Sequence, residues 1–192
     1  DIKKIFLTMN DKKNQLFISY IVIATLPAIF AGLFLKDHFL RIFDNIHLVG
    51  FALCSTGLIL ILSKRFKNNQ KEIGFSSSFL VGIAQAIAII PGISRSGSTI
   101  SMCIFLGIPP KEAARFSFLL SIPVILGASI LGFLELESDK TFNNLNLAIA
   151  IMTSFFTGVL ALKILLKVLE AGRFHFFGTY CLLAGLSAIL FS

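Results

Sequence analysis

Five uninterrupted apolar runs constrain this chain more than any other feature. Each is long enough to cross a hydrocarbon core of roughly 30 Å as a helix, and they cover residues 16–35, 46–63, 116–134, 145–162 and 174–192. Of the 192 residues, 56% are hydrophobic and only 14% are charged, which lies outside the usual range of a water-soluble globular domain. We therefore expect an all-α integral membrane protein that forms one polytopic domain over residues 1–192.

Residues 75–108 form a sixth apolar segment with a different pattern. Pro91, Gly92 and Gly97 fall within seven residues at its centre, and such a cluster breaks a continuous helix. Neither half is comfortably long enough to span a bilayer alone. The sequence therefore predicts a re-entrant hairpin of two short helices, in addition to five transmembrane helices.

The distribution of basic residues tests whether this segment returns to the side from which it enters, because cytoplasmic loops are rich in Lys and Arg. If it returns, one face holds three basic residues, Lys36, Arg41 and Lys140, and the other holds thirteen: Lys3, Lys4, Lys12, Lys13, Lys64, Arg65, Lys67, Lys71, Lys111, Arg115, Lys163, Lys167 and Arg173. If it crosses once, the two faces are almost equal. The bias favours the hairpin, an amino terminus in the cytoplasm, and an acidic stretch at Glu135, Glu137 and Asp139 outside. The net charge of +7 then reflects membrane orientation, and no nucleic-acid partner is expected.

Arg95 is the only charged residue between Phe75 and Pro110. An Arg at membrane depth costs at least about 2.5–3.5 kcal/mol, so it needs a compensating partner. Hydroxyl groups surround it, on Ser94, Ser96, Ser98, Thr99 and Ser101. A guanidinium, several hydroxyls and the free N–H groups of a helix start together suit a phosphate group, with Ser98 or Thr99 expected as the helix cap.

This pattern defines the candidate site. Arg95 and Ser94 are the candidate catalytic residues, and the candidate substrate-binding residues are Gly92, Ser96, Gly97, Ser98, Thr99 and Gln85. Two alternatives stay open: Arg95 snorkels while the hydroxyls satisfy backbone carbonyls, and Gln85 forms a hydrogen bond between helices. The spacing excludes a P-loop, because Ser98 stands where that motif needs Lys. The chain shows no metal-ligand spacing of His or Cys.

The stretch GIAQAIAIIPGISRSGSTIS, Gly82 to Ser101, closely resembles the second signature of the bacterial undecaprenyl-diphosphate phosphatase family, and ARFSFLLSIPVILGA, Ala114 to Ala128, looks like the stretch that follows it. The resemblance implies hydrolysis of undecaprenyl diphosphate to undecaprenyl phosphate and inorganic phosphate. That reaction recycles the lipid carrier of peptidoglycan synthesis, and excess activity gives bacitracin resistance. The family also implies a divalent cation, Mg²⁺ or Ca²⁺, and a bacterial plasma (inner) membrane location. Arg95 would hold the diphosphate, and Ser94, Ser96 and Thr99 would line it.

The same family implies an inverted-repeat fold with two re-entrant hairpins whose tips meet in the membrane. Its first signature, an ExxxE pair and a PVSSTGH string, does not occur upstream of Gly82, and all ten acidic residues fall in loops or at the ends of spans. We therefore expect the chain to lack an N-terminal part with the first hairpin, and no metal site within it. The alternative function is a polyprenyl-phosphate transporter or flippase, or an inactive truncated homologue. The expected partners are the bilayer and a polyprenyl diphosphate lipid, with a homodimer as a further hypothesis.

Overall fold

A computed structural model of the chain describes residues 12–34, 45–66, 70–134 and 144–191. These residues form seven helices and no strands: α2 (Lys12–Phe34), α4 (Ile46–Ser63), α5 (Phe75–Ile87), α6 (Arg95–Phe105), α7 (Pro110–Leu134), α8 (Asn144–Glu170) and α9 (His175–Leu190). The all-α prediction is confirmed.

Four helices are long and apolar enough to cross a membrane, judged by length and composition over the described residues: Lys12–Phe34, Ile46–Ser63, Pro110–Gly132 and Leu145–Glu170. The second coincides with the run predicted at 46–63. The remaining predicted span forms α9, which has 16 residues and is therefore about 24 Å long, shorter than a bilayer core. The structure supports a multi-pass membrane protein, and the arrangement of five spans plus a re-entrant hairpin remains a prediction.

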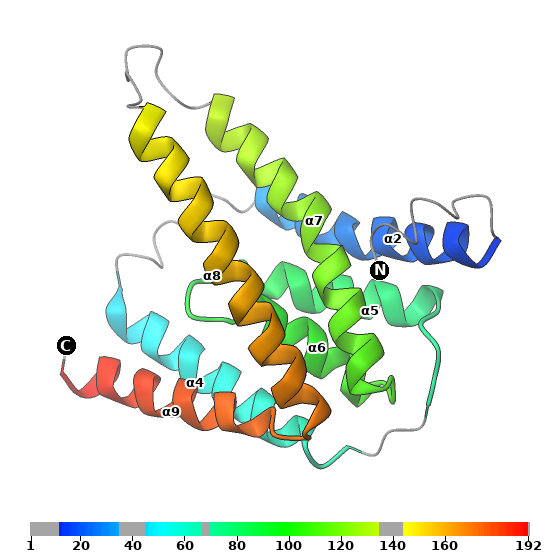
Figure 1. Cartoon of the computed structure of the whole chain (residues 1–192). Helices are drawn as coiled ribbons and strands as arrows, with labels where there is room; N and C mark the ends of the chain where they lie inside the picture. Colours follow the sequence, from blue (N-terminus) through cyan, green and yellow to red (C-terminus); the bar gives the residue numbers. More distant parts are fainter. Residues whose placement is uncertain (1–11, 35–44, 67–69, 135–143, 192) are drawn as a thin grey trace.

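The helices associate as two pairs with α6 between them. Helix α2 packs on α5, and α4 packs on α9, while α6 contacts α5, α4 and α7 (Figure 1). Helix α8 joins the core only near its end, through Leu165, Leu166 and Leu169, and residues 145–164 are exposed. A helix that is apolar all round and exposed over most of its length is suited to contact with lipid.

Four glycines bring α4 and α9 into close contact. Gly57 faces Gly178, and Gly50 faces Gly185, so the same seven-residue spacing occurs on both helices. A Cβ atom built on any of the four would lie between 2.6 and 2.7 Å from an atom of the other helix. Small residues of this kind let helix backbones approach closely in membranes. Helix α4 is therefore held against α9 along two turns.

Helices α5 and α6 form the hairpin that the Pro and Gly cluster predicts. Residues 88–94 connect them, and the two ends of the unit meet where the Lys71 N–H donates to the Gly107 carbonyl at 3.2 Å. Gly107 has φ +86° and ends α6, as Ile108 N–H donates to Cys103 O and Gly107 N–H to Ile104 O, the pattern of a Schellman motif. The two ends of this unit therefore lie side by side.

Several residues used for the orientation lie outside the described ranges. They are Lys3, Lys4, Lys36, Arg41, Lys67 and Lys140, together with the acidic stretch Glu135, Glu137 and Asp139. The orientation therefore remains a prediction from the sequence.

Candidate functional site

The loop between α5 and α6 lies against the first half of α4. Gly92 has φ +91°, and a Cβ atom on it would lie 2.5 Å from the Val49 carbonyl oxygen and 2.9 Å from the Ala52 Cβ. Both the left-handed backbone and the space therefore require glycine at this position. Gly92, a predicted substrate-binding residue, sets the path of the loop along α4.

Thr56 forms two hydrogen bonds with the end of the same loop. Its hydroxyl donates to the Gly92 carbonyl at 3.2 Å and accepts from the Ser94 N–H at 3.2 Å. Thr56 lies ten residues beyond Ile46, about 15 Å along α4 at 1.5 Å per residue. The start of α6 thus lies beside the middle of a helix long enough to cross a membrane, and the membrane depth of Arg95 stays a prediction.

Ser94 caps α6. Its Oγ accepts a hydrogen bond from the Gly97 N–H at 3.1 Å, and its carbonyl accepts from the Ser98 N–H at 2.8 Å. The prediction that Ser98 or Thr99 caps this helix is wrong. The helix starts one turn earlier than expected. The Ser94 N–H bonds to Thr56, and the backbone of Ser94 is extended, which is the conformation of a cap residue.

The first turn of α6 presents unused donors beside a guanidinium. The N–H groups of Arg95 and Ser96 have no acceptor among the described residues, since one turn of a helix start is not bonded internally. The Arg95 side chain is half-buried and makes no ion pair or hydrogen bond within the described ranges. Ser94 and Ser96 are half-buried too, so this turn can receive an anion.

The next residues of α6 face inward. Gly97, Ser98 and Thr99 are buried, and the Thr99 hydroxyl lies 2.6 Å from the Ser117 Oγ of α7 and donates to the Arg95 carbonyl at 2.9 Å. The hydrogen bond between the Thr99 and Ser117 hydroxyls links α6 with α7. A direct contact of Ser98 or Thr99 with a substrate stays a prediction.

Gln85 lies in the interior of the hairpin. It is 1% exposed, and neither atom of its amide group has a hydrogen-bond partner within the described ranges; the same is true of the Ser101 Oγ. A buried polar group without a partner costs about 1–3 kcal/mol. Neither the predicted contact of Gln85 with a substrate nor the alternative of a bond between helices is tested by this geometry.

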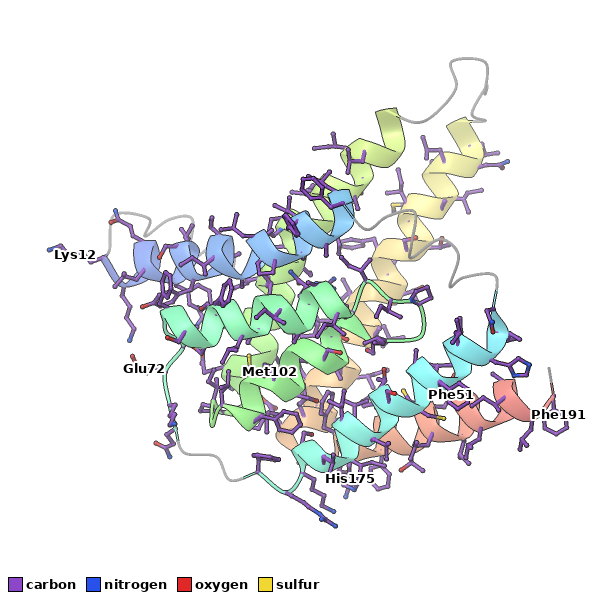
Figure 2. All side chains as sticks on the ribbon, turned by 180° about the vertical axis from the view of Figure 1, so that it is seen from behind. Lys12, Phe51, Glu72, Met102, His175 and Phe191 are labelled. Carbon is purple, nitrogen blue, oxygen red and sulfur yellow. The ribbon has the colours of Figure 1, made fainter. Side chains whose placement is uncertain are left out.

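The described residues do not fit a divalent cation at this turn. No group of three His, Cys, Asp or Glu side chains occurs among them. Glu112 pairs with Arg115 at 3.7 Å, and Glu170 pairs with Lys111 at 3.5 Å. Figure 2 shows Glu72 at the end of the hairpin opposite the 88–94 loop. The other seven acids, Asp1, Asp11, Asp37, Asp44, Glu135, Glu137 and Asp139, lie outside the described ranges.

Thr56 and Ser117 form hydrogen bonds in this region but do not belong to the predicted site. Each is a hydroxyl within an apolar helix, and such hydroxyls usually bond to the carbonyl one turn earlier in their own helix. Ser55 does so, with Phe51 O as its acceptor. Since Ser55 and Thr56 are adjacent and chemically alike, only the fold tells which of them reaches the loop.

The sequence of this chain is similar to those of known membrane proteins of one family. A sequence model of the family described as bacitracin resistance protein BacA matches residues 2–187. The undecaprenyl-diphosphatase of Methanococcus vannielii is 36% identical, over 98% of this chain and 77% of its own length. That of Desulforapulum autotrophicum is 39% identical over 88% and 63%, and undecaprenyl-diphosphatase 1 of Bacillus cereus is 35% identical over 97% and 71%. The chain thus spans between 63% and 77% of these relatives.

Proposed function

The chain belongs to the bacitracin resistance protein BacA family, and on this basis we propose that it is a membrane-embedded undecaprenyl diphosphatase. The reaction is hydrolysis of undecaprenyl diphosphate to undecaprenyl phosphate and inorganic phosphate. Relatives that carry this name cover most of the chain, and they favour the hydrolase over the transporter. The observation that carries the proposal is Arg95 in the first turn of α6, beside two backbone N–H groups that have no acceptor within the described ranges.

Arg95 is proposed to hold the diphosphate. Its planar guanidinium can grip two phosphate oxygens at once, which an ammonium cannot. The N–H groups of Arg95 and Ser96 and the positive end of the α6 dipole act on the same charge. In a setting that excludes water, fixed donors of this kind stabilise the charge that develops during phosphoryl transfer.

Ser94 and Ser96 are proposed to line the same turn. The Ser94 Oγ already accepts from the Gly97 N–H, so its remaining hydrogen is free to be donated to a phosphate oxygen. A nucleophilic role for Ser94 needs a neighbouring base; no acidic or imidazole side chain of the described ranges forms a hydrogen bond with it. The nucleophile is therefore assigned to no residue, and Gln85 is proposed as a further polar contact of the substrate.

A divalent cation, Mg²⁺ or Ca²⁺, is proposed from the family resemblance alone. The described residues supply no ligand set for it.

The membrane arrangement is proposed with five spans and the α5–α6 unit as a re-entrant hairpin entered from the cytoplasmic face of the bacterial plasma membrane. Its support is the contact between Lys71 and Gly107, which brings the two ends of the unit together, and the excess of Lys and Arg on one face. A homodimer is a separate hypothesis, which sedimentation of the solubilised protein tests.

The proposal is tested by phosphate release from undecaprenyl diphosphate in detergent micelles with Mg²⁺, alongside binding of the same lipid. We expect Arg95→Ala to lower turnover about 100-fold or more, as loss of an oxyanion donor does, and Arg95→Lys to recover only part of it. Arg65→Ala is the matched control, because Arg65 is exposed beyond the end of α4. Lipid binding without hydrolysis by the unsubstituted protein would favour the transporter, and Arg95→Ala with full turnover would remove Arg95 from the site.

A further inference from the structure

We propose that Thr56 is a positioning residue for Arg95: its hydroxyl fixes the 88–94 loop to α4 and so places the first turn of α6. The proposal deepens the proposed function, on which it rests. Thr56 is 1% exposed, and its hydroxyl bonds to the backbone of Gly92 and Ser94, just before the turn that would hold phosphate.

The hydrogen bonds of Thr56 depart from those of comparable hydroxyls. Thr25 and Thr153 donate to the carbonyl four residues earlier in their own helices, at 2.7 and 2.8 Å, and Ser55 does the same at 2.9 Å. Thr56, whose helix lies wholly in a described range, makes no such bond. Within the described ranges, the Thr56 hydroxyl forms hydrogen bonds with the loop alone.

Two backbone groups depend on this one oxygen. The Gly92 carbonyl and the Ser94 N–H both bond to it, and without it neither has another partner in the described ranges. Since water is scarce at this depth of a membrane, unpaired backbone groups are costly there. Loss of the hydroxyl is therefore expected to move or loosen the loop.

A movement of the loop would also displace Arg95. Ser94 is the cap of α6 and the residue before Arg95, so a shift of the Ser94 N–H displaces the guanidinium and both unused N–H groups together. Displacement of binding groups by about 1 Å can lower a rate about 100-fold. The α4 side of the contact cannot follow easily, because Gly50 and Gly57 hold α4 against α9.

The experiment compares Thr56→Val, which keeps the shape and removes the hydroxyl, with Thr56→Ser, which keeps the hydroxyl. Thr25→Val is the matched control: Thr25 is also buried in an apolar helix, but its hydroxyl donates to Ile21 of its own helix. We expect kcat/KM for undecaprenyl diphosphate to fall about tenfold or more in Thr56→Val, and to stay within about threefold of the unsubstituted protein in Thr56→Ser and Thr25→Val.

A second measurement does not depend on turnover. In protein labelled with ¹⁵N-serine, the Ser94 amide should exchange with solvent at least about tenfold more slowly than the Ser96 amide, because only Ser94 donates to a buried acceptor. Thr56→Val should remove this difference and Thr56→Ser should keep it.

The outcomes separate the two proposals. If the unsubstituted protein neither hydrolyses nor binds the lipid, the function fails, while the exchange of Ser94 still decides whether Thr56 holds the loop. If the protein is active and Thr56→Val matches Thr25→Val, or if Ser94 exchanges as fast as Ser96, the positioning role is overturned. If Thr56→Val does not fold, the exchange of Ser94 in the unsubstituted protein and the kinetics of Thr56→Ser decide it.

Discussion

Replacing Gly57 by Ala tests the close contact of α4 and α9. A Cβ atom on Gly57 would lie 2.7 Å from the Gly178 carbonyl oxygen and 2.7 Å from the Leu182 Cγ. Comfortable contacts between such atoms are nearer 3.5 Å, so the helices must separate by about 0.5–1 Å. One obstructing atom belongs to the backbone, and no change of rotamer relieves that contact.

Two opposed effects set the change in the free energy of unfolding. Overpacking of this kind costs about 1–3 kcal/mol, whereas Ala gains about 1 kcal/mol over Gly in a helix, which leaves a net loss of about 1 kcal/mol. Gly158→Ala is the control, because Gly158 lies in exposed α8 and a Cβ there meets nothing within 4 Å. It should be more stable than the original by about 1 kcal/mol. The two variants should therefore differ by about 4–8 °C in Tm.

Thermal unfolding in detergent can be followed with a thiol-reactive dye, because Cys103 is free and fully buried. Equal Tm values for Gly57→Ala and Gly158→Ala would refute the contact. Gly178→Ala supplies a second check: its Cβ would lie 2.7 Å from the Gly57 carbonyl oxygen. Since one separation of the helices relieves both contacts, the double variant should cost less than the sum of the two single variants.

Three further predictions concern the loop and the turn that follows it. Gly92→Ala should lower stability by about 2 kcal/mol or more and abolish turnover, because a φ of +91° is unfavourable for Ala and the Val49 oxygen lies 2.5 Å away; unfolding and phosphate release measure the two effects. Ser94→Asp keeps an oxygen to cap α6, so Tm should change by less than about 2 °C, while KM rises because the new carboxylate pairs with Arg95; an unchanged KM would contradict the anion site. Polyprenyl diphosphate at 100 times its Kd should stabilise the protein by about 2.7 kcal/mol, and Arg95→Ala should remove this gain in a Tm titration.

The elements that depend on local sequence are those that the sequence predicts well. Helix α4 covers the predicted run 46–63 without difference, and the break at Pro91 and Gly92 falls where the backbone cannot continue a helix. Helix α8 extends to Glu170, beyond residue 162, where the predicted span ends. The length of an apolar run reflects the thickness of a membrane, whereas a helix ends where the backbone leaves the helical conformation. Here Gly172, with φ +67°, ends it.

Features that depend on two distant segments could not be predicted from one sequence. The seven-residue spacing of Gly50 and Gly57 is visible in the sequence, but nothing there shows that α9 is the partner. The sequence predicts Ser98 or Thr99 as the cap of α6, because the half-helix is expected to open at Gly97, yet any of five neighbouring hydroxyls can cap a helix. The contact with Thr56 selects Ser94, and that contact exists only once α4 lies beside the loop.

The position of Arg95 at the start of a helix favours an anionic ligand. The start of a helix carries a partial positive charge, so a cation there is unfavourable, by typically 0.3–1 kcal/mol. Arg95 occupies the first residue of α6, and no carboxylate of the described ranges pairs with it. A chain that needed Arg95 only for packing would gain by placing it at the other end of the helix. A negative charge that joins the guanidinium and the helix start stabilises both, and a diphosphate supplies that charge.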